Sequence, residues 1–99
     1  MKFEFASDET KSLAEGKESD RNYQAGIGQA FRKRIQSIAA AKDIRDLYAI
    51  RSHRFEKLKG ERSHQYSMRL NDQWRLIVEI REAADEPVIV IISIEDYHK

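Results

Sequence analysis

The chain contains no cysteine, one proline and no apolar run long enough to cross a membrane. Without cysteine there can be no disulfide framework, thiolate metal site or cysteine nucleophile. The N-terminal stretch MKFEFASDETKSLAEG is charged throughout and lacks the apolar core of a signal peptide. These absences predict a protein of the reducing cytoplasm that does not contact a membrane.

Motifs for several catalytic chemistries are also missing. There is no glycine-rich phosphate loop, no HExxH pattern and no recognisable serine elbow. The histidines, His53, His64 and His98, are too scattered to form a metal-site pattern. We therefore expect no cofactor and no metal, and any reaction would depend on side chains alone.

The length of 99 residues predicts one domain over residues 1–99, with one sheet and helices packed against it. Alternating and helical spacings of apolar residues predict the elements. Strands are expected at 2–6, 53–58 and 88–95, helices at 7–16 and 23–42, and a short helical or turn segment at 43–47. Residues 88–95 are apolar on both faces, which predicts a central strand covered on both sides. The fold class is α+β, with an N-terminal strand and two helices on one face of a twisted, mainly antiparallel sheet.

Two β-like runs meet at a turn between Leu70 and Trp74. Successive side chains of a strand point to opposite faces, so apolar residues face apolar residues only if the loop has an odd length. A loop at 71–73 pairs Leu70 with Trp74 and also sets Arg69 opposite Arg75. Like charges directly across a hairpin are unfavourable, so this pair predicts an anion-binding patch.

Charge is distributed unevenly along the chain although the formal net charge is only +1. Residues 21–75 hold 13 Lys and Arg against 5 Asp and Glu, whereas both flanking segments are acidic. Such segregation indicates a nucleic-acid or acidic-protein partner. The alternative is a basic surface that is merely solvated.

These residue types fit the metal-free cleavage of RNA, in which the 2′-OH attacks the adjacent phosphate. The reaction requires a base, an acid and cations around the phosphate, and His and Arg supply them near neutral pH. An aromatic ring can stack on an unpaired base. The candidate cations are Lys57, Lys59, Arg62, Arg69 and Arg75, with Tyr97 for stacking and Asp96 and His98 for proton transfer.

Each candidate also has a purely structural interpretation. The lysines and Arg62 could belong to a solvated turn, and the two hairpin arginines could pair with Asp72 or Glu79. His98 lies next to the last residue, where a frayed end is common.

The motif LKGERSHQYSMRLNDQWRLI, followed by EDYH near the end of the chain, resembles the HigB-type branch of the RelE-like toxins. The resemblance covers nearly the whole chain and is densest from Arg54 onward. It implies a ribosome-dependent endoribonuclease that cuts mRNA in the ribosomal A site, neutralised by a cognate helix-turn-helix antitoxin of the HigA type. Operator DNA would be bound only through that antitoxin.

The resemblance also implies roles for individual residues. Asp96 and His98 would transfer protons, Lys59 and Arg75 would stabilise the phosphate, and Tyr97 would stack on or position a base. Lys57, Arg62 and Arg69 would add RNA-binding charge. Some members of the family have a histidine where this chain has Glu56, and the roles of His53 and His64 stay open. Two alternatives remain: a non-catalytic RNA- or ribosome-binding module, and an inactive toxin that acts with its antitoxin as a DNA-binding repressor.

Overall fold

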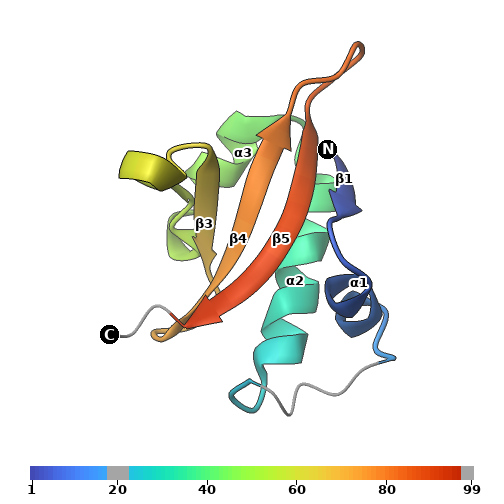
Figure 1. Cartoon of the computed structure of the whole chain (residues 1–99), viewed down its shortest axis with the longest axis vertical. Helices are drawn as coiled ribbons and strands as arrows, with labels where there is room; N and C mark the ends of the chain where they lie inside the picture. Colours follow the sequence, from blue (N-terminus) through green and yellow to red (C-terminus); the bar gives the residue numbers. More distant parts are fainter. Residues whose placement is uncertain (18–22, 97–99) are drawn as a thin grey trace.

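The computed structural model describes residues 1–17 and 23–96 (Figure 1). Within these residues the elements are β1 Lys2–Phe5, α1 Asp8–Ala14, α2 Ile27–Ala40, α3 Ile44–Ala49, η1 Arg51–His53, β2 Glu56–Lys57, η2 Gly60–Arg62, β3 Gln65–Arg69, β4 Trp74–Arg81 and β5 Val88–Asp96. The predicted α+β fold is confirmed, although the segment after α2 is a helix in its own right. No helix among the described residues has the length and apolar character needed to cross a membrane.

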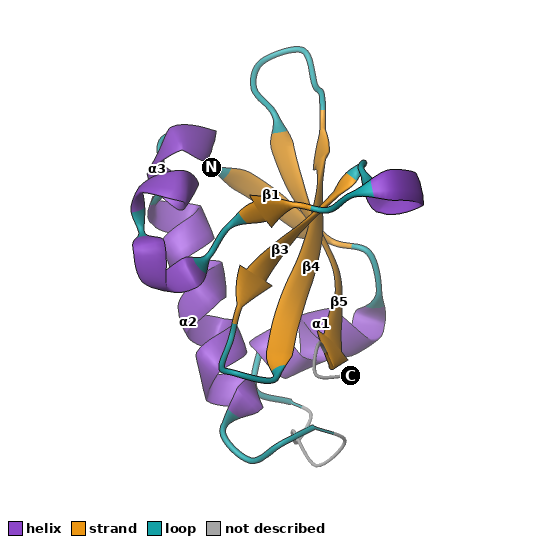
Figure 2. Cartoon of the chain, turned by 90° about the vertical axis from the view of Figure 1, so that its left-hand side faces the viewer, coloured by secondary structure: helices purple, strands orange, loops and turns teal. Residues whose placement is uncertain are grey.

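The sheet has the strand order β1-β5-β4-β3-β2. β1 pairs with β5 in parallel, and the other neighbours are antiparallel. The helices pack on one face of the sheet (Figure 2), where side chains of α1, α2 and α3 share a core with those of β3, β4 and β5. Leu13, Phe31, Leu47, Leu76 and Ile91 are buried members of this core. The opposite, helix-free face carries no α-helix among the described residues.

The predicted hairpin register is confirmed. Met68 pairs with Leu76 and Arg69 pairs with Arg75 across β3 and β4. The Asn71 side chain accepts hydrogen bonds from the backbone N–H groups of Gln73 and Trp74, each with a donor–acceptor distance of 2.8 Å. An Asn side chain that bonds the backbone two residues ahead stabilises a turn, which explains how so short a loop holds the register.

Capping determines where the first two helices begin. Ser7 accepts a hydrogen bond from the Thr10 N–H, as expected for the cap of α1. The second helix was predicted from residue 23, but α2 begins only at Ile27. Gly26 precedes it with φ of 89°, a left-handed conformation that glycine adopts readily and that cannot continue a right-handed helix.

The predicted strand 53–58 is wrong in its first half. Residues 51–53 form η1, Arg54 follows in a left-handed conformation, and only Glu56 and Lys57 pair with β3. The reason is packing: Phe55 stacks on Tyr66 with ring centroids 5.1 Å apart and inserts into the core. The chain therefore turns at Arg54 before it reaches the sheet edge.

The prediction that β5 is covered on both sides is only half right. β5 lies between β1 and β4, as an apolar strand should. Ile89 and Ile91 are buried beneath the helices, but Val90 and Ile92 remain partly exposed. α1, α2 and α3 form a single layer, so no described α-helix covers the second face of the strand, where η2 reaches only its end through Arg62.

Candidate active site

The helix-free face of the sheet carries the polar side chains of the hairpin and of β5. Its residues follow from the register, because directly paired residues of neighbouring strands lie on the same face. They form three cross-strand rows: Gln65, Glu79 and Val90; Ser67, Ile77 and Ser93; and Arg69, Arg75 and Glu95.

The third row concentrates charge near the end of β5. Arg69 lies opposite Arg75, and Arg75 lies opposite Glu95. Arg69 also forms an ion pair with Asp72 of the turn, as the structural interpretation of the sequence allowed. The row therefore brings two of the predicted cations beside the strand that leads into the predicted catalytic tail.

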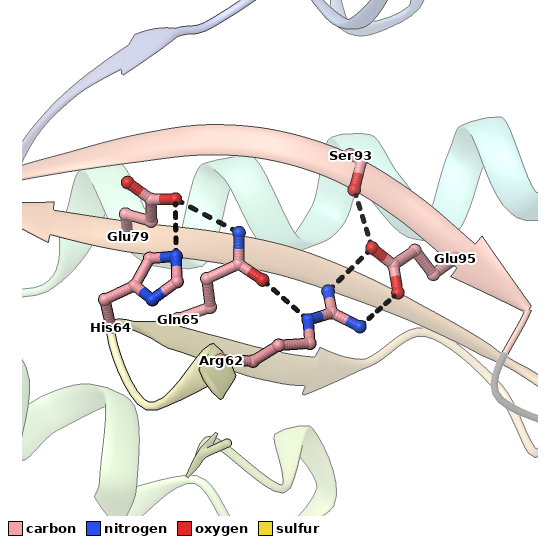
Figure 3. A network of polar contacts seen from close by, with 6 residues as sticks. All are labelled: Arg62, His64, Gln65, Glu79, Ser93 and Glu95. Atoms are coloured by element: carbon pink, nitrogen blue, oxygen red, sulfur yellow. Dashed lines mark hydrogen bonds and ion pairs between the residues drawn. The ribbon is translucent and has the colours of Figure 1, made fainter. Parts of the chain in front are cut away.

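Arg62 lies over the same face and belongs to a polar network (Figure 3). Its guanidinium donates to both carboxylate oxygens of Glu95, at distances of 3.0 and 2.8 Å. It also donates to the side-chain oxygen of Gln65 at 2.9 Å. Gln65 in turn donates to Glu79, and Ser93 donates to Glu95. A bidentate pair of this kind holds η2 against the end of β5.

A cavity of about 430 Å³ opens beside the row of arginines. It is lined by Ser52, Arg54, Arg69, Asp72 and Arg75. Arg54 has φ of 45°, and it is the one non-glycine residue with positive φ in the described part of the chain. A left-handed conformation costs a non-glycine residue about 1–2 kcal/mol. Such strain persists only where the surrounding structure enforces it, and it is concentrated at functional sites.

Two further residues, Arg34 and His53, adjoin residues that line this cavity. Arg34 of α2 donates from Nε to the backbone carbonyl of Arg69 over 2.9 Å, where β3 has no further strand partner. Burial and the nearby charge of Arg69 lower the pKa of Arg34. His53 is only 6% exposed, and its Nδ1 has no hydrogen-bond partner among the described residues. Burial, and then the charge of Arg34, lower the pKa of His53, which favours the neutral imidazole.

The predicted proton-transfer residues are described only in part. Asp96 is exposed at the end of β5, is in register with Trp74 and accepts a hydrogen bond from Gln73 over 3.0 Å. Tyr97 and His98 lie outside the described residues. The structure thus places the start of the tail directly after Glu95, next to the arginine row.

The two predicted lysines are not in the arginine cavity. Lys57 is paired with Tyr66 and lines a different cavity of about 450 Å³, together with Ile44, Ile80 and Pro87. Lys59 is exposed and precedes η2, where Gly60 has φ of 66°. The glycine permits this turn, which carries Lys59 and Arg62 into the loop before β3.

Sequence reasoning did not include Arg54 and Ser52 among the site residues. A regular strand over 53–58 would not bring Arg54, or Ser52 just before it, beside the hairpin. The turn at η1 and Arg54 does this. The available signal was the basic and polar stretch Arg51-Ser52-His53-Arg54 after a helix, which is also compatible with a solvated loop.

Comparisons with known proteins bear on the family and the fold of the chain. A family model described as the RelE-like toxin of the type II toxin-antitoxin system HigB matches residues 3–98. A search of curated protein sequences found no significant match. Among solved structures, a YoeB/ParE toxin from Agrobacterium tumefaciens is similar, with a TM-score of 0.63, 17% identity and 100% coverage of both chains. YafQ from E. coli strain BL21(DE3) has a TM-score of 0.59 and 11% identity, covering 95% of this chain and 90% of that chain. At these identities the two structures support the fold alone.

Proposed function

Because this chain belongs to the HigB-like family of RelE-like type II toxins, we propose that it is a ribosome-dependent endoribonuclease that cleaves mRNA in the ribosomal A site. The observation that carries the proposal is the row of Arg69, Arg75 and Glu95 on the helix-free face. This row gathers guanidinium groups beside the strand end that leads into Asp96, Tyr97 and His98.

The proposed reaction needs no metal. One group of the tail removes the proton from the 2′-OH, whose oxygen attacks the adjacent phosphorus, and the other protonates the departing 5′-oxygen. Asp96 and His98 are assigned to these proton transfers, which contribute about 100- to 10,000-fold when the groups are well positioned. Lys59 and Arg75 neutralise the charge that develops on the phosphate oxygens. Tyr97 stacks on or positions a base.

Further cations are assigned to the RNA backbone. Arg69, Arg62 and Lys57 add positive charge around the catalytic residues. Arg69 shares the cavity with Arg75, and Arg62 spans from η2 to β5. Lys57 of β2 lines the separate cavity of about 450 Å³. Arginine suits this task because its planar group binds phosphate with two parallel hydrogen bonds.

Membership of a type II family implies a cognate antitoxin. We assign to that partner a helix-turn-helix fold of the HigA type, through which the complex would bind operator DNA. The other partners of the toxin are mRNA and the ribosome. The site of action is then the cytoplasm.

Expression without the antitoxin, followed by primer extension on translated mRNA, tests this proposal. Wild-type protein should stop growth and generate new 5′ ends within translated codons, and His98→Ala or Arg75→Ala should abolish both effects. Arg81→Gln is the matched control, because Arg81 pairs with Glu4 at the other end of the sheet. Growth arrest without new ends would indicate a binding module, and harmless overexpression would indicate an inactive toxin. Full toxicity after deletion of residues 96–99 would refute the role of the tail.

A further inference from the structure

We infer that the cavity beside the arginine row binds a phosphodiester of the RNA strand next to the scissile one, and that Arg54 is its dedicated phosphate-binding residue. The inference rests on the proposed function, because it concerns the same RNA substrate. It assigns a role to Arg54 and Ser52, which the chemistry of the catalytic tail does not use.

The charge of the cavity supports an anionic ligand. Arg54, Arg69 and Arg75 contribute three guanidinium groups, and Asp72 contributes one carboxylate, so the lining holds two positive charges in excess. Asp72 is already paired with Arg69. Among residues 1–17 and 23–96, no carboxylate forms an ion pair with Arg54. Arg54 therefore has no carboxylate partner within the described part of the chain, and a phosphate would supply the counterion.

The size and the donors of the cavity match a phosphodiester. Its volume of about 430 Å³ falls in the range typical of ligand sites and exceeds what one water molecule needs. All three cations are arginines, whose forked donors match the oxygens of phosphate better than the single ammonium group of lysine. The Ser52 hydroxyl adds a hydrogen-bond donor for a phosphate oxygen. Contacts to the phosphates of RNA do not depend on the base sequence.

The backbone at Arg54 holds its side chain beside the hairpin. The neighbours on either side, His53 and Phe55, are both buried, and the Arg54 N–H donates to the Arg51 carbonyl over 3.1 Å. Together these contacts impose the left-handed conformation at Arg54. Glycine would adopt this conformation without strain, so the fold alone gives no reason for an arginine here.

Arg75 belongs both to the proposed cleavage site and to the cavity. Arg75 lines the cavity and also lies opposite Glu95, next to the start of the catalytic tail. A strand whose scissile phosphate lies beside Arg75 and Asp96 would thus bring a neighbouring phosphate within reach of Arg54.

The test uses Arg54→Gly and Arg54→Asn, which remove the charge but accept a positive φ, and Arg51→Gln as a matched control. Arg51 is an exposed arginine of the same η1 turn and does not line the cavity. Binding of a short fluorescein-labelled RNA with 2′-O-methyl groups, which cannot be cleaved, is measured by anisotropy over a range of salt concentrations. Circular dichroism melts monitor folding, and Tm should not fall in Arg54→Gly.

Both Arg54 variants should weaken RNA binding by about tenfold. The negative slope of the logarithm of the association constant against log salt should become less steep by about 0.7, as expected when one phosphate contact to a single strand is lost. Arg51→Gln should change neither quantity. If the Arg54 variants bind RNA with unchanged affinity and slope while wild-type protein cleaves translated mRNA, the subsite is refuted and the proposed function stands. If RNA binding depends on Arg54 but wild-type protein never cleaves, the nuclease proposal fails and the phosphate subsite stands.

Discussion

Arg69 and Arg75 are direct cross-strand partners in the β3–β4 hairpin, with the turn residues 71–73 between the strands. Both side chains line the same cavity, together with Ser52, Arg54 and Asp72. Two guanidinium groups in this position repel each other. Arg69 also forms an ion pair with Asp72 of the turn. The hairpin thus holds positive charge at a cost in stability, where the proposed nuclease needs it.

A double-mutant cycle with Arg69→Gln and Arg75→Gln should measure this repulsion. We expect an unfavourable coupling of about 0.2–1 kcal/mol in the free energy of unfolding, because like charges lie directly across the strands. The coupling should shrink as salt rises, since the Arg69 side chain is partly exposed. Urea unfolding at low and high salt provides the values. A favourable coupling at low salt would contradict the repulsion.

The Arg62–Glu95 pair should act mainly by positioning the end of β5. Arg62→Gln and Glu95→Gln should each lower the free energy of unfolding by no more than about 1 kcal/mol, because both side chains are partly exposed. If the pair positions the catalytic tail, each substitution should slow mRNA cleavage to a similar extent, and the double variant should be no slower than either. Faster cleavage by Glu95→Gln would instead indicate that Arg62 binds RNA directly and that Glu95 competes with the RNA.

His53 should make the fold sensitive to mild acid. Its pKa is lowered in the folded state, so at pH values below the ordinary pKa of about 6.5 the unfolded chain binds a proton that the folded protein excludes. Stability should therefore fall by up to about 1 kcal/mol as the pH drops from 7.5 to 5.5. His53→Asn should flatten this dependence in urea unfolding. Equal pH dependence in wild type and His53→Asn would exclude His53 as the cause.

Gly60 should be needed for the turn that carries Lys59. Gly60→Ala should lower the free energy of unfolding by about 1 kcal/mol or more, because φ of 66° strains any residue with a Cβ, although no atom lies within 4 Å of the added group. Gly60→Asn should lose less, since Asn tolerates this conformation. Gly16→Ala is the control, with a similar φ of 75° far along the chain. Both alanine variants should lose stability in urea unfolding, but only Gly60→Ala should also lower the rate of mRNA cleavage per molecule of folded protein.

Local patterns were sufficient to predict the fold class and half of the candidate site. The alternation of the hairpin residues and the odd loop placed Arg69 opposite Arg75 because a strand has a strict two-residue period. The Ser7 cap was equally local. The last strand was predicted to be interior because apolar residues occupy both its faces. Whether helices cover one face or both could not be predicted from this pattern, because it depends on how many layers of helices the chain forms.

Only the tertiary structure decided which segments complete the site. η1 brings Ser52 and Arg54 beside the hairpin, and Arg34 of α2 bonds the Arg69 carbonyl across a separation of 35 residues. Neither contact follows a local period, because each depends on how Phe55 and the helices pack into the core. The sequence by itself determined the arginine pair, since strand geometry needs only neighbouring residues. The cavity around that pair was decided by the fold, since it requires segments that meet only after the core has formed.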